Sequence, residues 1–162
     1  MVDFVSKLSY DVDDLKTLIG VLRGPQGCPW DREQTHKSIR RNLLEEAFEA
    51  AEAIDSGSTD ELLEELGDVL MQVVFHADIA DNAGLFTLND IADTACKKLI
   101  RRHPHVFKGV SAKDGDESLV VWEEIKRAEN IAREQGKRLS DMTSEEFEDF
   151  CLEYRSDKEL EK

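Results

Sequence analysis

Two clusters of acidic residues lie close together in the first half of this 162-residue chain. The first contains Glu45, Glu46 and Glu49, and the second contains Glu64, Glu65 and Asp68. Residues three or four apart share one face of a helix, so each cluster predicts a patch of carboxylates on a helix surface. Two facing patches would repel each other unless a cation lay between them. Carboxylate oxygens at this density suit a hard divalent ion, Mg²⁺ or Mn²⁺, which in turn suits a polyphosphate substrate.

The simplest alternative is that these acidic residues are solvated side chains on ordinary helices. Two features favour a metal site. Asp68 is a poor helix former at a mid-helix position, and the neighbouring Gly67 costs about 1 kcal/mol relative to alanine. The acidic residues also border the apolar positions of their helices, where carboxylates are only partly hydrated. From the residues alone, both interpretations stay open.

A second group of candidates is basic and aromatic. Lys98 and Arg102 are four residues apart, so they share a helix face and could contact phosphate groups. Their alternative role is to stabilise the C-terminal end of a helix. Trp30 follows a proline in a predicted loop, where it could stack on a nucleobase or cover the end of a bundle. Trp122 and Lys126 share one face of a later helix; Trp122 is typical of a core position, and Lys126 could reach a phosphate.

Apolar residues recur at helical spacing, and the alternation typical of strands is scarce, so the sequence predicts an all-α helical bundle. The expected helices are 11–23, 35–55, 58–82, 87–103 and 117–135, with a short last helix from 143. Two prolines and two glycines make 24–29 a loop. Ser58 and Glu61 have capping-box spacing just after a short turn, so the second and third helices should form an antiparallel hairpin. On this hairpin the two carboxylate patches can face each other.

The expected apolar stripes of the hairpin are Ile39, Leu43, Ala47, Ala50 and Ile54 on one helix, and Leu62, Leu66, Val69, Leu70, Val73 and Ala77 on the other. A further stripe, expected to cover a partner subunit or the site itself, contains Phe147, Phe150 and Tyr154.

Composition narrows the classes of protein further. The length suits one domain, and 40% hydrophobic residues can form a core. A net charge of −15 argues against binding a nucleic-acid polymer, although a metal ion can bridge the protein to a free nucleotide. We expect no membrane span, since no run of about 18 apolar residues occurs, and no signal peptide. Three widely spaced cysteines, Cys28, Cys96 and Cys151, are expected to be free thiols in a reducing cytoplasm.

Four segments together resemble the MazG family of nucleoside triphosphate pyrophosphohydrolases. They are G-C-P-W-D-x-x-Q-T-H at 27–36, L-E-E-x-x-E at 44–49, E-L-G-D at 65–68 and R-R-H-P-H-V-F at 101–107. They occur in the order found in that family, and the similarity covers about residues 10 to 130. On this basis we expect residues 1–136 to form a MazG-like domain and 137–162 to form a helical extension of it.

The resemblance implies Mg²⁺-dependent cleavage of a nucleoside triphosphate into a monophosphate and pyrophosphate, as housekeeping of the nucleotide pool. It implies an all-α protein that assembles as a dimer or tetramer. The metal ligands it implies are Glu46, Glu49, Glu65 and Asp68. Glu45 would lie in the outer shell or act as the base that activates water. The implied phosphate and nucleotide contacts are Lys98, Arg102, Trp122 and Lys126.

Two other functions are consistent with the sequence. The chain could be a non-catalytic nucleotide-binding module that regulates a partner protein, or a purely structural acidic helical protein. A complete set of acidic residues favours the enzyme, because a decayed copy should have lost some of them.

Overall fold

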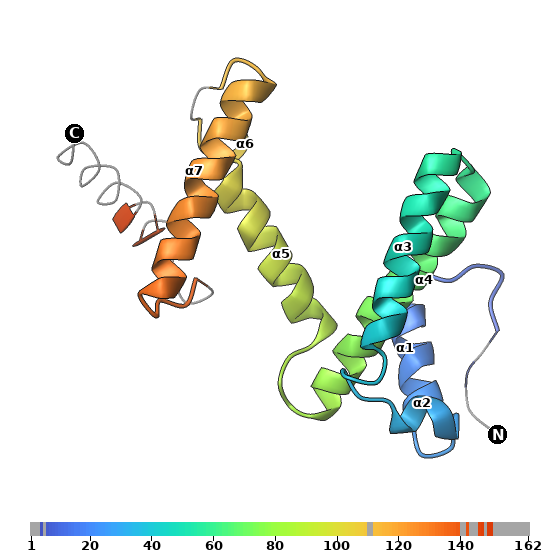
Figure 1. The fold of residues 1–162 in the computed structure, drawn as a ribbon. Helices are drawn as coiled ribbons and strands as arrows, with labels where there is room; N and C mark the ends of the chain where they lie inside the picture. The colour runs from blue at the N-terminus through green and yellow to red at the C-terminus, as the bar shows by residue number, and fades with distance from the viewer. Residues whose placement is uncertain are drawn as a thin grey trace. The chain divides into compact units, whose positions relative to one another are not determined.

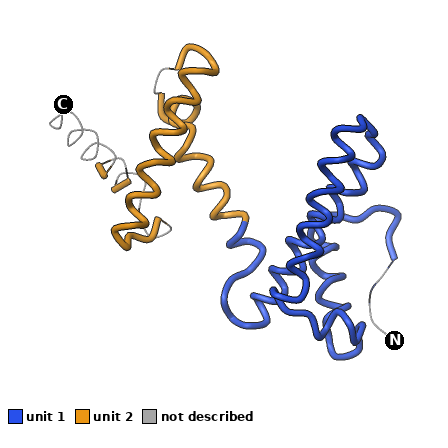
Figure 2. The backbone as a smooth tube through the Cα atoms, viewed as in Figure 1, with its two compact units in different colours: residues 1–91 blue, residues 92–162 orange. Residues whose placement is uncertain are grey.

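The computed structural model describes residues 4, 6–109, 112–139, 142, 146–147 and 149–150. The chain divides into two compact units, Met1–Ile91 and Ala92–Lys162 (Figure 2). The described residues form seven α-helices and no strand (Figure 1), which confirms the prediction of an all-α fold. Among these helices, none combines the length and the apolar character needed to cross a membrane.

The hairpin of α3 (Arg40–Ser56) and α4 (Thr59–Asn82) is the main structure of the first unit. These two helices pack along each other more extensively than any other pair (Figure 1). Gly57 adopts the left-handed conformation that ends α3, with φ of 73°, and glycine reaches this conformation without a steric penalty. The side chain of Ser58 then caps α4 by accepting a hydrogen bond from the backbone nitrogen of Glu61 at 3.3 Å. These local signals confirm the predicted antiparallel hairpin.

The core of the first unit lies at the C-terminal half of α4, where α1 (Val12–Arg23) packs against it. Its buried residues are Ile19, Ile39, Val74 and Phe75. The other half of the hairpin has no comparable cluster among the described residues. The predicted apolar stripes were therefore wrong in part: Ala50 and Ala77 are buried, but Ile54 and Leu66 are 62% and 53% exposed.

The segment before α3 differs from the prediction in two places. Residues 36–39 form a turn and α3 begins only at Arg40, so the predicted start at 35 was too early; Thr35 and Ser38 exchange hydrogen bonds between side chain and backbone at this turn. A short helix, α2 (Pro29–Glu33), begins at the proline that the sequence analysis placed at the end of a loop. Proline suits the first position of a helix, since its missing N–H would have no partner there.

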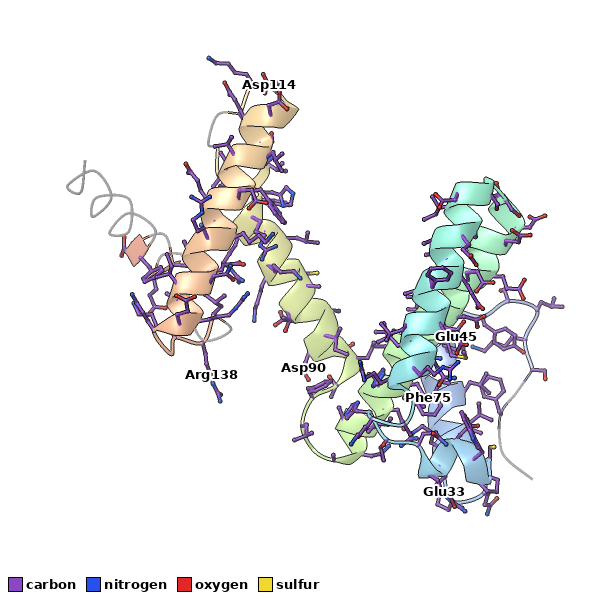
Figure 3. The ribbon with its side chains drawn as sticks, in the orientation of Figure 1. Glu33, Glu45, Phe75, Asp90, Asp114 and Arg138 are labelled. Atoms are coloured by element: carbon purple, nitrogen blue, oxygen red, sulfur yellow. The ribbon has the colours of Figure 1, made fainter. Side chains whose placement is uncertain are left out.

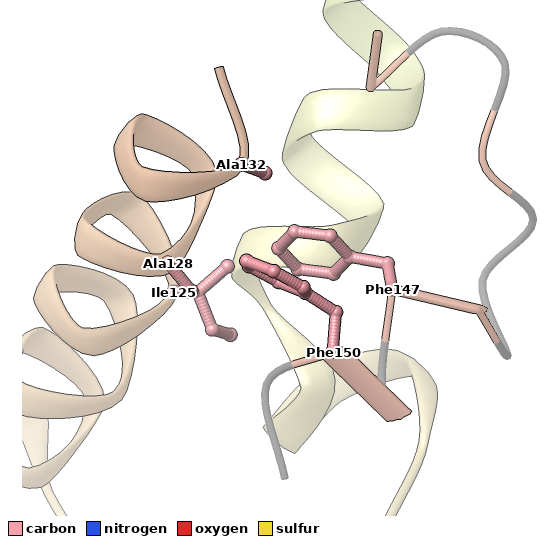
Figure 4. Close-up of a cluster of buried hydrophobic side chains, with 5 residues drawn as sticks. All are labelled: Ile125, Ala128, Ala132, Phe147 and Phe150. Carbon is pink, nitrogen blue, oxygen red and sulfur yellow. The ribbon is translucent and has the colours of Figure 1, made fainter. Parts of the chain in front are cut away.

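The second unit contains most of α5 (Leu88–Arg102), together with α6 (Pro104–Phe107) and α7 (Gly115–Glu134). Asp114 caps α7 by accepting a hydrogen bond from the backbone nitrogen of Glu117 at 2.9 Å, so this helix begins two residues before the predicted start. Phe147 and Phe150 pack against the apolar face of α7 (Figure 4). The expected stripe therefore covers α7, although its third member, Tyr154, lies outside the described residues.

Candidate functional site

Three carboxylates converge on the α3–α4 hairpin. Glu46 and Glu49 come from α3 and Glu65 from α4, and each offers an oxygen atom within 4.8 Å of the others. Figure 3 labels the adjacent Glu45 on this part of α3. The convergence follows from the three-residue spacing on one helix and the antiparallel return of the next. It brings together three of the four residues expected to bind metal.

Burial and neighbouring negative charges raise the pKa of two members of this cluster. Burial raises the pKa of Glu46, and the charges of Asp68 and Glu49 raise it further. Burial also raises the pKa of Glu65, followed by the charges of Glu49 and Asp68. Asp68 thus acts on the cluster through its charge, although it is not one of the three converging residues. None of the ion pairs within the described part of the chain involves these four side chains.

The donor set fits a divalent cation. Oxygen ligands from several carboxylates are what Mg²⁺ and Mn²⁺ bind, and a cation between them would remove their mutual repulsion. Glu45 lies beside the cluster, is exposed, and has the guanidinium of Arg41 3.8 Å away. Both residues line an open hollow of about 500 Å³ on α3, together with Leu44, Phe48 and Glu49. The site is therefore open to a ligand from solvent.

Trp30 lies on α2 and is 58% exposed, so its ring does not plug the bundle in this structure. Arg23, a residue to which the sequence analysis gave no role in the site, fixes this segment. Its Nε atom donates a hydrogen bond to Oδ2 of Asp78 on α4 at 2.6 Å, and its Nη1 atom donates to the backbone oxygen of Asp31 at 2.5 Å. In the sequence, an arginine in the last turn of a helix is explained by its favourable interaction with the helix dipole. No local pattern therefore predicts the contacts of Arg23 with Asp78 and Asp31.

His36, from the same segment 27–36 as Trp30, pairs with His76 of α4. Their Nδ1 atoms lie 2.8 Å apart, and their rings stack with an interplanar angle of 5°. One ring must donate and the other accept, so at least one of them is neutral. Burial lowers the pKa of His76, and the charge of His36 lowers it further.

Acidification is expected to weaken the first unit through this pair. Because the pKa of His76 is lower in the folded than in the unfolded chain, the unfolded chain binds more protons below about pH 6.5, and stability falls as the pH falls. Thermal unfolding followed between about pH 7.5 and about pH 5.5 should show a smaller decrease in Tm for His76→Gln than for the wild type. The same substitution at His103, in the second unit, serves as the control. Equal pH slopes for the wild type and His76→Gln would contradict this role.

Apart from Trp30, the basic and aromatic candidates lie in the second unit. Lys98 is exposed on α5, while the Arg102 side chain is only 12% exposed. The Cζ atom of Arg102 lies 4.9 Å from the ring centroid of Trp122, and Nζ of Lys126 lies 4.7 Å from the same centroid. Two cations therefore flank one indole, which is a favourable cation–π arrangement.

Glu129 is the main residue of this region that sequence reasoning missed. It is fully buried and accepts hydrogen bonds from the guanidinium groups of both Arg101 and Arg102. The signal was available, because Glu129 follows Ile125 by four residues and so falls within the apolar stripe of α7. A carboxylate in such a stripe needs a buried partner.

The cysteine prediction is confirmed for the residues described: Cys28 and Cys96 are free. Cys151 lies outside the described residues.

Comparison with known proteins identifies the family. Residues 34–107 match the family model described as the MazG nucleotide pyrophosphohydrolase domain. The chain is 48% identical over 136 residues to the nucleoside triphosphate pyrophosphohydrolase/pyrophosphatase MazG of Thermotoga maritima, covering 82% of this chain and 49% of that protein. It is 46% identical over 132 residues to the nucleoside triphosphate pyrophosphohydrolase of Escherichia coli K12, covering 81% of this chain and 50% of that protein.

A third relative gives the same result. The chain is 52% identical over 107 residues to the nucleoside triphosphate pyrophosphohydrolase of Mycobacterium tuberculosis, covering 65% of this chain and 33% of that protein. This chain spans about half, or less, of the length of these relatives. The matched segment includes the acidic cluster and the arginine pair, Arg101 and Arg102. The resemblance seen in the sequence is therefore confirmed, and residues 34–107 of this chain form a MazG domain.

Proposed function

We propose that this chain hydrolyses nucleoside triphosphates to nucleoside monophosphates and pyrophosphate, with Mg²⁺ as its cofactor and Mn²⁺ as a substitute. The observation that carries the proposal is the convergence of Glu46, Glu49 and Glu65, which offer oxygen atoms within 4.8 Å of one another. A triphosphate carries about four negative charges and would be repelled by such a site. A divalent ion held there reverses the local sign, so metal and substrate would bind together.

The proposed roles of the acidic residues follow from their positions. Glu46, Glu49 and Glu65 bind the metal, and Asp68, whose charge already acts on two of them, completes the set. When bound, the metal supplies charge neutralisation and Lewis-acid activation at the α-phosphate. Glu45, exposed beside the cluster, accepts the proton of the attacking water as the bond between the α- and β-phosphates breaks and pyrophosphate leaves.

The remaining candidates are proposed to hold the nucleotide. Lys98, Arg102 and Lys126 would neutralise the outer phosphates as negative charge develops on the departing pyrophosphate. The exposed ring of Trp30 is available to stack on a base, whereas Trp122 is flanked by two cations and would act mainly through them. The substrates would be free nucleotides of the cellular pool.

The proposal includes assembly into a dimer or tetramer in the cytoplasm. Large apolar side chains on the α3–α4 hairpin support it, because they are exposed in the single chain and would be covered by another subunit. They are Leu44, Phe48, Ile54, Leu63 and Leu66.

A product assay tests the proposed reaction. The protein is incubated with a panel of ribo- and deoxyribonucleoside triphosphates and Mg²⁺, and pyrophosphate and orthophosphate are measured separately. We expect pyrophosphate and the monophosphate in equal amounts, loss of activity with EDTA, and recovery with Mg²⁺ or Mn²⁺. Mg²⁺ should also raise the Tm, because it binds the folded chain.

The other outcomes distinguish the alternatives. Nucleotide binding without turnover would favour a regulatory module. Orthophosphate as the only inorganic product would indicate a different phosphatase class. A Tm unaffected by Mg²⁺ and by nucleotides would indicate a structural protein.

A further inference from the structure

Glu129 has an environment that a solvated glutamate never has. Its side chain is fully buried on α7, and four N–H groups of two arginines point at its carboxylate. Arg101 donates from Nε and Nη2 to one oxygen at 3.2 and 3.0 Å. Arg102 donates from Nε and Nη2 to the other oxygen at 3.0 and 2.6 Å. Charge-assisted bonds of this length fix the orientation of both guanidinium planes.

The orientation of Arg102 is fixed from two directions. Glu129 holds the edge formed by Nε and Nη2, and the indole of Trp122 lies against the guanidinium group. In the described part of the chain, Nη1 of Arg102 makes no hydrogen bond that would compete with a ligand. Nη1 is therefore the atom of Arg102 that can bind an anion.

The charges in this group do not cancel. One carboxylate faces two guanidinium groups, and Arg133 adds a third, whose Nη2 atom lies 3.8 Å from Glu129. Lys126 lies near the ring of Trp122, the same ring that Arg102 contacts. The group is thus net positive in a chain whose overall charge is −15. The side chains of Arg101 and Arg102 are 14% and 12% exposed, so two largely buried guanidinium groups face one buried carboxylate, and this excess of buried positive charge favours a role in binding an anion.

We propose that Glu129 is a positioning residue, which orients Arg102 against Trp122 so that Arg102 and Lys126 form one binding unit for the phosphate chain of the substrate. This inference rests on the proposed function for the identity of the substrate. The probe that tests it independently is inorganic triphosphate, which carries the phosphate chain without a nucleoside.

The test compares Glu129→Gln with Glu123→Gln. Glu123 lies on the same helix, is half exposed and, among the described residues, pairs with Lys126 at 3.8 Å, so it controls for the loss of one negative charge on α7. In Glu129→Gln the side-chain amide would face one of the two arginines with N–H groups, and Arg102 would lose its fixed orientation. We expect KM for the triphosphate to rise about 10-fold or more, the usual effect of removing an orienting partner, with a smaller change in kcat. Glu123→Gln should change both by less than about 3-fold.

Binding of inorganic triphosphate is measured by tryptophan fluorescence in a Trp30→Phe background, so that Trp122 is the single reporter. We expect affinity to fall in Glu129→Gln by the same factor as KM rises. If Glu129→Gln does not fold, as judged by circular dichroism, Glu129→Asp decides: it keeps the charge, moves the carboxylate back by one methylene group and should raise KM to a smaller extent.

The possible failures are distinct. If the wild type binds triphosphate but hydrolyses no nucleotide, the proposed function fails while the positioning role is still measured by binding. If a folded Glu129→Gln or Glu129→Asp variant has the KM and the triphosphate affinity of Glu123→Gln, the proposal is overturned.

Discussion

Replacing Glu49 by glutamine is expected to abolish Mg²⁺ binding and to lower the rate of nucleotide hydrolysis by at least about 100-fold, since loss of a metal ligand should exceed the 10- to 100-fold effect of losing an outer-shell partner. Glutamine has nearly the shape and helix propensity of glutamate, so α3 should remain folded. The substitution removes one of the three carboxylates whose oxygen atoms lie within 4.8 Å of one another. Asp68→Asn should act in the same direction, because its charge acts on the same cluster.

The measurements are steady-state hydrolysis and the increase in Tm caused by Mg²⁺. Glu52→Gln is the matched control, because Glu52 lies three residues after Glu49 on α3, is exposed and is not one of the three converging carboxylates. We expect the control to keep both activity and the Mg²⁺ effect. In the absence of Mg²⁺, Glu49→Gln should unfold at the wild-type temperature or above, because a repulsive charge has been removed. Hydrolysis by Glu49→Gln at the wild-type rate would refute the metal assignment.

The secondary structure of the hairpin could be predicted because its signals are local. Gly57 and Ser58 end one helix and begin the next within two residues, and the helical period of the acidic residues sets which of them share a face. The start of α3 could not be predicted by periodicity. Apolar spacing extends back to Ile39, but residues 36–39 form a turn and the helix begins at Arg40.

The exposed apolar residues show what periodicity leaves out. A helical stripe indicates which face avoids water and not which element covers it. Leu66 and Ile54 fit the stripe, yet the described residues of the first unit cluster at the other end of the hairpin, around Val74. Assembly into an oligomer, as proposed above, would reconcile the pattern with the structure.

The candidate site divides in the same way between local and distant contacts. Spacing within two neighbouring helices predicted a carboxylate patch on each helix, while the set of Glu46, Glu49 and Glu65 was implied by the family resemblance; the structure brings these three residues together. The partners of Arg102 and Arg23 were not predictable, because they lie 27 and 55 residues away along the chain. Such pairs depend on how helices pack, and a single sequence contains no local signal for their register.

Replacing Arg23 by methionine is expected to destabilise the first unit by about 2 to 3 kcal/mol, in the range for breaking a partly buried ion pair. The Arg23 side chain is 9% exposed, and its guanidinium joins Asp78 on α4 to the backbone of Asp31 while lying over the ring of Phe75. Methionine can fill the space of the aliphatic stem, but within the described part of the chain it leaves the carboxylate of Asp78 with the amide of Asn82 as its one side-chain partner. The asparagine bond keeps the loss below that of a fully unpaired buried charge.

Thermal unfolding should show this loss as a decrease in Tm of roughly 5 to 10 °C for a chain of this length. Arg32→Met is the control, since Arg32 is exposed and its Nη1 atom bonds only the backbone oxygen of Pro25 at 3.0 Å. Because the backbone bond to Asp31 holds α2 in place, Arg23→Met should also change the emission of Trp30 and raise KM for the nucleotide if Trp30 contacts the base. Equal Tm values for Arg23→Met and Arg32→Met would mean that packing of α1 on α4, and not this ion pair, holds the Trp30 segment against the hairpin.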